Sequence, residues 1–291
     1  MSVLTYAQYM ERIGFPAEAI RTVDAAITSL GENPAAVPLL YTAEKQLFDK
    51  AEPDKTFLET LVRAKETTDL PQETLDMAFL VSCLPRLRDG YLCRGIPEEI
   101  FWDSMHDLTC KLRECYDNRG VYGTFVTFWY PGFYRMTRFA LGRLQYEYGT
   151  FPYDDRDGIR KNARIVQCHI PSSGPLTDEL VTDSLARAKA FFPDDLIGGR
   201  LPVYCSSWLI YPPLVGIFPE GSNLRRFAER FTVVDAIPRP ENGDFWRIFN
   251  FPYDPEKLAD APEDTSLRRA VKAFLLAGNC LGAGKGIIWS D

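Results

Sequence analysis

The sequence predicts an α+β protein with an α/β-like second part: an all-helical N-terminal domain, residues 1–135, followed by a mixed-sheet domain, residues 136–291. Apolar residues recur at helical spacing, punctuated by proline and glycine, up to about residue 118. From about residue 136 onward, segments with an apolar residue at every second position alternate with segments of helical period. This interleaving of strands and helices is typical of an α/β or α+β domain.

Proline and glycine mark the helices expected in the first domain. The clearest helix spans residues 97–116, where apolar residues follow one another at spacings of three or four and Gly120 supplies a stop. The residues of that face are Phe101, Met105, Leu108, Leu112 and Cys115. Earlier helices are expected over residues 16–30, 38–50 and 57–65, and Pro71 opens a strongly apolar segment.

Aromatic residues crowd the segment 122–134, around Pro131 and Gly132. One interpretation is a hinge at which two domains pack. The other is the aromatic wall of a ligand pocket. The sequence leaves both open.

The second domain begins with a pattern of period two over residues 141–148. It predicts a strand that turns Leu144, Tyr146 and Tyr148 to one side and three polar residues to the other. Those polar residues are Arg143, Gln145 and Glu147. A turn-rich stretch, 152–162, then leads to a strand over 164–170, so a hairpin is the simplest pairing.

The elements expected after this hairpin alternate in type. They are a helix over 177–192, a strand over 203–210, a helix over 223–231, strands over 232–237 and 245–249, a helix over 266–277 and a short strand over 287–289. Ser222 and Asn223 fit a helix N-cap. The glycine-rich segment 282–286 is expected to be a turn, because a phosphate-binding loop would lie between a strand and a helix in the opposite order.

Composition limits the classes of partner. The chain has 291 residues, 33 of them basic and 40 acidic, which gives a formal charge of −7. With a pI near 5.1, it lacks the basic character of a nucleic-acid-binding protein, so no nucleic-acid partner is expected. Residues 1–14 lack the pattern of a signal peptide, and no apolar run is long enough to span a membrane, so we expect a cytoplasmic protein without a membrane partner. The oligomeric state is left open.

Cysteine and histidine counts argue against a metal site. The seven cysteines form no C-x-x-C pair and are odd in number, so we expect reduced thiols rather than a disulfide framework. Only two histidines, His106 and His169, are present. We therefore expect no metal.

The segment 164–177 reads as a strand that runs through a serine- and glycine-containing turn into a helix. Unpaired backbone N–H groups and the helix dipole favour negative charge at such a helix start. His169 lies at the end of the strand. The junction is therefore a candidate binding site for a phosphate-bearing ligand.

Five short segments stand out: Phe139-Ala-Leu-Gly-Arg-Leu-Gln145, His169-Ile-Pro-Ser-Ser-Gly-Pro-Leu176, Cys205-Ser-Ser-Trp208, Gly221-Ser-Asn-Leu224 and Gly282-Ala-Gly-Lys-Gly286-Ile. Together they resemble a bacterial family described as acyltransferase-domain proteins. The resemblance covers most of the chain and implies a helical N-terminal domain joined to a GNAT-like C-terminal domain. It also implies an acyl-CoA-dependent N-acyltransferase that uses acetyl-CoA or a longer acyl-CoA as cosubstrate and a small-molecule or peptide amine as acceptor.

The resemblance implies roles for ten residues. N-acylation by a thioester needs a base for the amine proton and a proton donor for the departing thiolate. His169 and Glu147, expected on one face of the hairpin, are candidates for the base, and Tyr211 occupies the position in which this fold often has the donor. Ser172, Ser173, Gly174 and Thr177 are expected to bind the cofactor, and Arg143, Gln145 and Trp208 the substrate.

Two other functions remain open. The turn Ser172–Thr177 has one glycine where the superfamily loop has more, and Asp178 and Glu179 put negative charge into the first helical turn. These features favour a non-catalytic ligand-binding or interaction protein on the same scaffold. A hydrolase that uses Cys205, paired with His169 across adjacent strands, or Ser173 is the third possibility.

Overall fold

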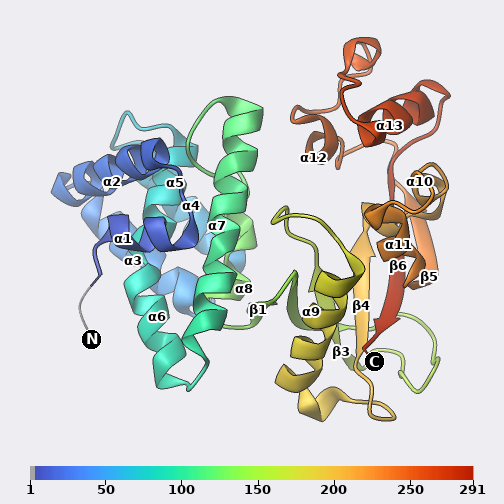
Figure 1. The fold of residues 1–291 in the computed structure, drawn as a ribbon. Helices are drawn as coiled ribbons and strands as arrows, with labels where there is room; N and C mark the ends of the chain where they lie inside the picture. Colours follow the sequence, from blue (N-terminus) through green and yellow to red (C-terminus); the bar gives the residue numbers. More distant parts are fainter. Residues whose placement is uncertain (1–3, 291) are drawn as a thin grey trace. The chain divides into compact units, whose positions relative to one another are not determined.

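The structure is a computed structural model that describes residues 4–290. The chain divides into two compact units, Met1–Phe139 and Ala140–Asp291 (Figure 1). The first unit is helical and the second contains a six-stranded sheet. Each unit is described by itself below.

Seven helices build most of the first unit. They are α1 (Tyr6–Ile13), α2 (Ala17–Glu32), α3 (Val37–Phe48), α4 (Asp54–Lys65), α5 (Gln72–Ser82), α6 (Leu84–Cys93) and α7 (Glu98–Arg119). The central helix is α5, in which every residue from 74 to 81 is buried. A helix that is buried on all sides must be covered on all sides by other elements.

Local signals in the sequence set the ends of these helices. Thr5 and Gln8 form a capping box at the start of α1, in which each side chain bonds the other residue's backbone N–H. At the end of α7, Gly120 adopts a left-handed conformation with φ 68° and donates to the carbonyl of Tyr116. The expected stop at Gly120 is therefore confirmed.

The aromatic segment folds within the helical unit as η1 (Thr127–Trp129) and α8 (Pro131–Tyr134). Tyr130, Phe133 and Tyr134 are fully buried there. The hydroxyl of Tyr134 donates to the carbonyl of Leu80 at 2.6 Å. This segment therefore contributes core side chains to the first unit.

The sheet of the second unit has the strand order β1-β2-β3-β4-β6-β5. Its strands are β1 (Arg138–Leu141), β2 (Leu144–Thr150), β3 (Arg164–His169), β4 (Pro202–Ser207), β5 (Thr232–Pro238) and β6 (Gly282–Trp289). β2 pairs with β3 in antiparallel register, as expected for the hairpin, and β6 pairs antiparallel with both β4 and β5. β3 and β4 run parallel, connected through α9 (Asp178–Phe191).

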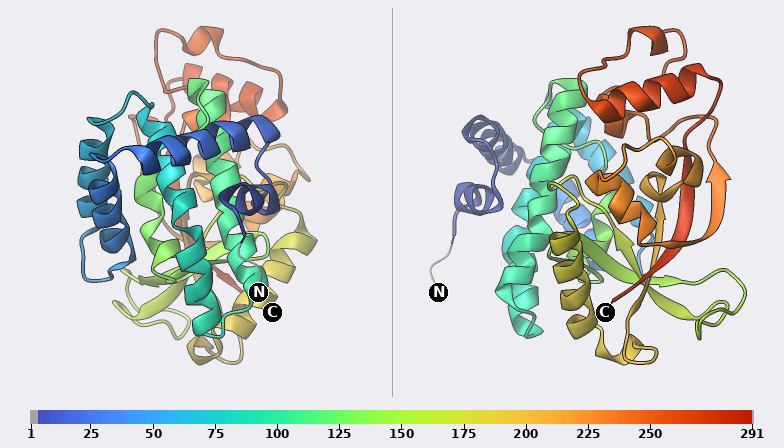
Figure 2. Two further views of the ribbon diagram at one scale, coloured as in Figure 1. Left: turned by 90° about the vertical axis from the view of Figure 1, so that its left-hand side faces the viewer. Right: turned by 45° about the vertical axis from the view of Figure 1, so that its right-hand side comes forward.

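Helix α9 covers one face of the sheet (Figure 2). Its Ser184 lies 3.0 Å from the hydroxyl of Tyr146 and also accepts from the backbone N–H of Leu144. Because side chains alternate along a strand, the register places Cys168 and Cys205 on this same face as Tyr146. Gln145, Glu147, Gln167 and His169 consequently lie on the other face.

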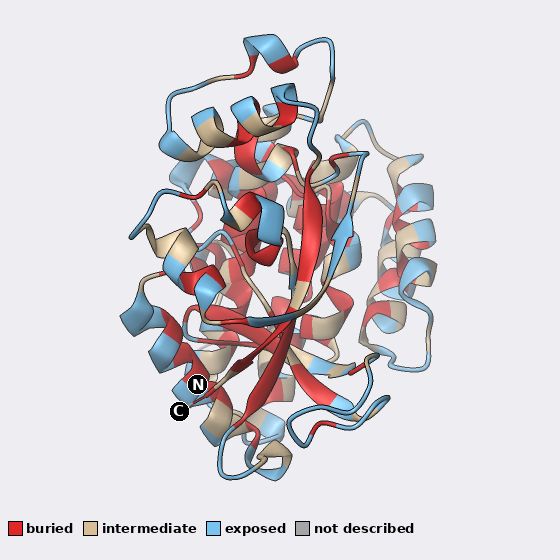
Figure 3. Cartoon of the chain, turned by 90° about the vertical axis from the view of Figure 1, so that its right-hand side faces the viewer, coloured by how far each residue is buried: buried red, intermediate tan, exposed pale blue. Residues whose placement is uncertain are grey.

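A small apolar cluster covers part of that other face. It consists of Phe151, Ile159, Ile165, Tyr204 and Ile287. Ile165 is near the start of β3, whereas His169 is its last residue. The cluster therefore buries the amino-terminal end of β3. The strand β5, at the edge of the sheet, is mostly exposed (Figure 3).

The remaining helices follow β4 and β5. After β4 come η3 (Trp208–Ile210), α10 (Pro212–Val215) and α11 (Asn223–Glu229), and α9 is followed by η2 (Pro193–Asp195). The segment 239–281 carries α12 (Trp246–Phe249), η4 (Leu258–Asp260) and α13 (Ser266–Leu276) between β5 and β6. Figure 1 shows α12 and α13 beyond the edge where β5 ends and β6 begins.

Four expected elements differ from the structure. Residues 141–148 are not one strand, because Gly142, with φ 72°, turns the chain between β1 and β2. The strand expected over 203–210 ends at Ser207, whose hydroxyl caps η3. Residues 246–249 form the helix α12, and Phe245 precedes it as the N-cap residue. The rings of Phe245 and Phe249 stack at 4.2 Å across one helical turn.

The fourth difference is the glycine-rich segment 282–286, which is strand rather than turn. A Cβ atom on Gly284 would collide with the backbone carbonyl of Ile210, and one on Gly282 would lie 2.6 Å from the ring of Tyr211. The glycines thus allow η3 to pack directly on β6. Close approach of two backbones, and not turn formation, explains this composition.

Candidate active site

Glu147 and His169 form the centre of the candidate site. In the β2–β3 ladder Gln145 stands opposite His169, and Glu147 stands opposite Gln167. Glu147 and His169 are therefore diagonal neighbours on one face, close enough for long side chains to meet. The Nε2 atom of His169 lies 2.7 Å from Oε1 of Glu147, and the two side chains are 25% and 16% exposed.

Gln167 positions the carboxylate of Glu147. Its amide Nε2 donates to Oε1 of Glu147 at 3.0 Å. Gly149 makes room for this amide, since a Cβ atom at that position would lie 2.7 Å from Oε1 of Gln167. Neither residue was among the expected site residues, because the requirement appears only once the register of the hairpin is known.

This arrangement suits acid–base chemistry. An ionised carboxylate only accepts hydrogen bonds, so the neutral tautomer of His169 that fits Glu147 carries its proton on Nε2 and its lone pair on Nδ1. The pair is therefore equipped to accept a proton from a bound molecule. Gln145, opposite His169, is 2% exposed.

The pair lies where β3 and β4 stop pairing. Their parallel ladder ends at Cys168 and Cys205, whereas β4 continues to Ser207 in register with Gly284 of β6. His169 is thus one residue beyond the described end of the ladder. The carboxyl ends of parallel strands, followed by a helix start, are a common place for ligands.

Arg143 shapes the loop between β3 and α9. Its guanidinium donates to the carbonyls of Pro175 at 2.9 Å, Pro171 at 3.0 Å and Gly174 at 2.6 Å. Arg143 is 8% exposed. The structure thus places this expected substrate-binding residue beneath the loop, where it fixes the backbone.

The expected cofactor-binding residues lie in and after this loop. Ser172, Ser173 and Gly174 are exposed, and Gly174 has a φ of 136°. Thr177 is the N-cap of α9, and its hydroxyl accepts from the backbone N–H of Leu180 at 3.4 Å. This loop contains a single glycine, and the hydrogen bonds from Arg143 hold it in a defined shape.

Two arginines, one in α11 and one directly after it, lie beside the amino-terminal part of α9. Arg226 pairs with the carboxylate of Asp178 at 3.1 Å. Arg230 donates to the hydroxyl of Thr182 at 3.1 Å. The backbone N–H of Glu179, the hydroxyl of Thr177 and the charge of Arg226 lower the pKa of Glu179. The acidic first turn is therefore partly neutralised, by residues that no local motif in the sequence marks as part of this junction.

Trp208 and Tyr211 follow β4 in η3 and at its end. Trp208 is half-buried, and Tyr211 is 7% exposed with its ring against Gly282. Burial raises the pKa of Tyr211, with a smaller effect from Cys280. The phenol is therefore protonated at neutral pH, as a proton donor must be.

The proposed pairing of Cys205 with His169 is wrong. Cys205 is the register partner of Cys168, so the two thiols share the face that α9 covers, while His169 occupies the opposite face. Cys205 is 1% exposed. Ser173 lies exposed in the loop before α9.

Residues 4–290, the part of the chain that the structure describes, contain neither grouped metal ligands nor a membrane-spanning helix. In that part of the chain no three or more histidine, cysteine, aspartate or glutamate side chains are grouped as metal ligands. No helix in the same range is long and apolar enough to cross a membrane.

The sequence profile described as "GNAT-like C-terminal domain" matches residues 139–288, slightly more than half of the chain. The chain belongs to this GNAT-like family. A second profile, "N-acyltransferase N-terminal domain", matches residues 5–136. The expected family and the expected fold class, a helical N-terminal part followed by a GNAT-like mixed sheet, are both confirmed.

Solved structures resemble this GNAT-like protein over nearly its whole length. An acyltransferase in complex with decanoyl-CoA and teicoplanin has a TM-score of 0.77 and 24% identity, covering 97% of this chain and 86% of the other. An acyltransferase in complex with decanoyl-CoA has a TM-score of 0.74 and 26% identity, covering 96% of this chain and 85% of the other. A comparison with curated proteins found no match.

Proposed function

We propose that the protein is an acyl-CoA-dependent N-acyltransferase that transfers an acyl group to an amine of a small molecule or peptide. The observation that carries this proposal is the half-buried Glu147–His169 pair at the carboxyl end of β3, where the ladder to β4 ends. Similarity to acyltransferases in complex with decanoyl-CoA supports the acyl-CoA substrate.

The chemistry assigns one proton-transfer role to each end of the reaction. An acceptor ammonium gives one proton to solvent, and the resulting amine attacks the thioester carbonyl. A C–N bond forms, the second proton passes from nitrogen to the His169–Glu147 pair, and the C–S bond breaks. Tyr211 protonates the departing thiolate and is reprotonated from solvent, to which the His169–Glu147 pair releases its proton. The products are an amide, the free thiol of CoA and one proton released to solvent.

The junction at α9 fits the diphosphate of CoA. Residues 172–174 are exposed, and Thr177 begins a helix whose amino-terminal end carries the positive end of the helix dipole. Arg226 and Arg230 add positive charge beside α9. This charge offsets the negative charge of Asp178 and Glu179. We assign Arg143 the role of positioning this loop, and Gln145 and Trp208 contact with the acyl group or the acceptor.

Calorimetry and a thiol-release assay test the proposal. We expect octanoyl-CoA and decanoyl-CoA to bind, more tightly than acetyl-CoA, and to release CoA thiol when a primary amine is added. Absence of binding by all three at millimolar concentration would end the proposal. Tight binding without thiol release, across neutral, acidic and basic amines, would instead favour a non-catalytic binding protein.

A further inference from the structure

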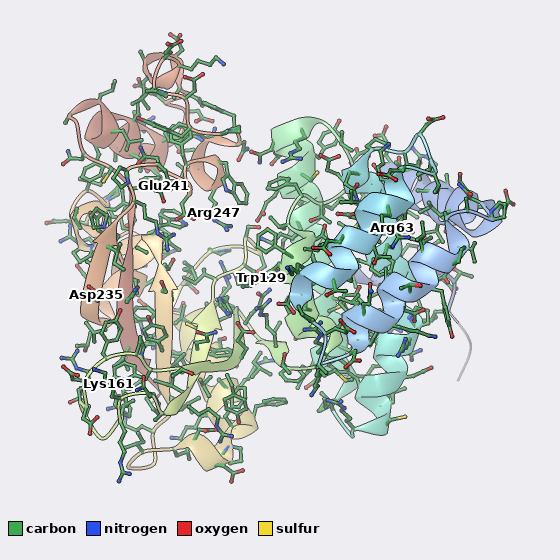
Figure 4. The ribbon with its side chains drawn as sticks, turned by 180° about the vertical axis from the view of Figure 1, so that it is seen from behind. Arg63, Trp129, Lys161, Asp235, Glu241 and Arg247 are labelled. Carbon is green, nitrogen blue, oxygen red and sulfur yellow. The ribbon has the colours of Figure 1, made fainter. Side chains whose placement is uncertain are left out.

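A second polar cluster lies on the sheet face that carries Glu147 and His169. It consists of Tyr153, Asp235 and Lys285, from the loop after β2, from β5 and from β6 respectively. The hydroxyl of Tyr153 donates to Oδ2 of Asp235 at 2.9 Å, and Nζ of Lys285 lies 3.6 Å from the same oxygen. Figure 4 shows Asp235 on β5.

The register places this cluster level with His169. Ser206 is paired with Lys285, and Lys285 is paired with Asp235. The last pair of the parallel β3–β4 ladder is Cys168 with Cys205. The next residue on each strand is His169 on β3 and Ser206 on β4. Tyr204, two residues before Ser206, shares its face with Gln167. Lys285 therefore stands on the same face as His169, two strands away.

Both carboxylate oxygens of Asp235 accept a hydrogen bond from its own chain. Its Oδ1 accepts from the backbone N–H of Ala236 at 2.8 Å and its Oδ2 from Tyr153. The hydrogen bond from Tyr153 is the main cause that lowers the pKa of Asp235, with a contribution from Lys285. Asp235 thus serves as a fixed counter-charge.

Within residues 4–290, the ammonium group of Lys285 has no contact as short as these. Its contacts with described residues are the 3.6 Å ion pair to Asp235 and the ring of Tyr153, whose centroid is 5.8 Å from Nζ. At 3.6 Å the contact with Asp235 is longer than a normal hydrogen bond, and an ammonium group has three donors. The side chain is only 22% exposed. A partly buried cation with unused donors is a binding site for an anionic oxygen.

We propose that Lys285 binds the carboxylate of the amine acceptor and so selects ω-amino acids or short peptides. This inference rests on the proposed acyl transfer and specifies its acceptor. Neighbouring strands are about 4.8 Å apart, so Lys285 and His169 are separated by roughly 10 Å. An acceptor that reaches both must have its amine several bonds from its carboxylate. Two or three extended residues, at about 3.4 Å each, meet this requirement, and so does an ω-amino acid.

The test compares acceptors that differ only in the carboxylate. Triglycine and 6-aminohexanoate are paired with their C-terminal amides, and hexylamine serves as an acceptor without a polar tail; decanoyl-CoA is the donor. For the wild-type protein we expect a KM for each carboxylate at least tenfold below that of its amide, because hydrogen bonds to charged groups typically contribute this factor or more. The kcat values of each pair should agree.

Three variants assign the preference to Lys285. Lys285→Met keeps the apolar stem and should abolish the preference by raising the KM of the carboxylates, while Lys285→Arg should retain most of it. The double variant Lys285→Met with Asp235→Asn removes the remaining negative charge and should still show no preference. Lys161→Met is the matched control, because Lys161 forms an exposed ion pair with Asp154 in the same unit.

Binding of the products gives a readout without turnover. N-Octanoyl-triglycine should bind the wild-type protein at least tenfold more tightly than its amide in calorimetry, and equally in Lys285→Met. Equal wild-type KM values for acids and amides, or an unchanged preference in Lys285→Met, would overturn the inference and leave acyl transfer intact. Failure of all acceptors, hexylamine included, to release thiol would instead contradict the proposed function.

Discussion

His169 and Glu147 meet diagonally across the β2–β3 ladder, with Nε2 of the imidazole 2.7 Å from Oε1 of the carboxylate. The same oxygen accepts the amide of Gln167. Two donors therefore converge on one carboxylate oxygen. This arrangement fixes the orientation of the imidazole ring, and the tautomer follows from the acceptor-only character of the carboxylate.

Glu147→Gln and His169→Ala should each lower kcat by about 100-fold or more, the usual range for loss of a general base. The affinity for decanoyl-CoA should change little, because neither residue belongs to the loop before α9. Tyr148→Phe is the control, since Tyr148 follows Glu147 on β2 but faces the other side of the sheet. Steady-state kinetics and calorimetry provide the measurements. An unchanged kcat in both site variants would contradict the assignment.

Arg143→Met should weaken binding of decanoyl-CoA by about tenfold, because three loop carbonyls lose their shared donor. Arg143→Lys should not restore binding, since an ammonium cannot reproduce the planar geometry of a guanidinium. Arg187→Met in α9 is the control, as Arg187 forms an exposed ion pair with Asp183. Equal affinities of Arg143→Met and wild type in calorimetry would argue against a positioning role.

Arg226→Gln and Arg230→Gln should each raise the Kd for decanoyl-CoA. This loss of affinity should be larger at low salt. Screening shortens the range of charge interactions as ionic strength rises. The Kd of each variant should therefore depend less on salt than that of the wild type between 50 and 500 mM KCl, concentrations chosen for the assay. Arg225→Gln, from the same helix but paired with Glu229, should behave like the wild type. Identical salt dependence in all four proteins would refute the charge contribution.

Gly284→Ala should destabilise the sheet unit by about 3 kcal/mol, because the added Cβ collides with the backbone carbonyl of Ile210 and one strand or η3 must shift. Gly31→Ala in α2 is the matched control: a Cβ there meets nothing within 4 Å. This change should stabilise by roughly 0.5 kcal/mol through helix propensity. Urea unfolding followed by circular dichroism measures both. A Gly284→Ala variant as stable as wild type would contradict the close approach.

Burial raises the pKa of Asp76 to about 6, although hydrogen bonds from Thr127 and Gln72 oppose the shift. The folded state therefore binds the proton more tightly than the unfolded state, whose carboxyl keeps its ordinary value of 3.8. Between pH 4 and pH 6 this carboxyl should make the helical unit less stable as the pH rises, by about 3 kcal/mol in total.

The variant Asp76→Asn isolates this effect from the other carboxyl groups. The difference in unfolding free energy between wild type and variant should shift in favour of the variant as the pH rises from 4 to 7. Thermal unfolding at several pH values provides the measurement. A difference that is constant over this range would show that Asp76 does not titrate as described.

Local signals in the sequence predicted many of the elements. Thr177 and Gly120 mark the ends of α9 and α7 through capping interactions that involve only neighbouring residues. The alternation of Gln145 and Glu147 with apolar residues predicted which side chains of β2 share a face, whereas the register with β3 became known only from the structure. These features depend on short stretches of chain, which is why a single sequence reveals them.

Other features depend on contacts between distant segments. Gly284 is a strand residue because Ile210, far away in sequence, passes directly over it. Arg226 approaches Asp178 only after β4 has brought α11 beside α9. The helix α12 has four residues, too few for a helical period to be distinguished from a strand. No pattern within a short window contains this information.

The strands β5 and β6 pair from Thr232 to Pro238, with one irregularity between Val233 and Asp235, although the segment 239–281 separates them in the sequence. The chain leaves the sheet at Pro238 and returns opposite it at Gly282. The intervening residues can consequently be lengthened, shortened or exchanged during evolution without disturbing any ladder.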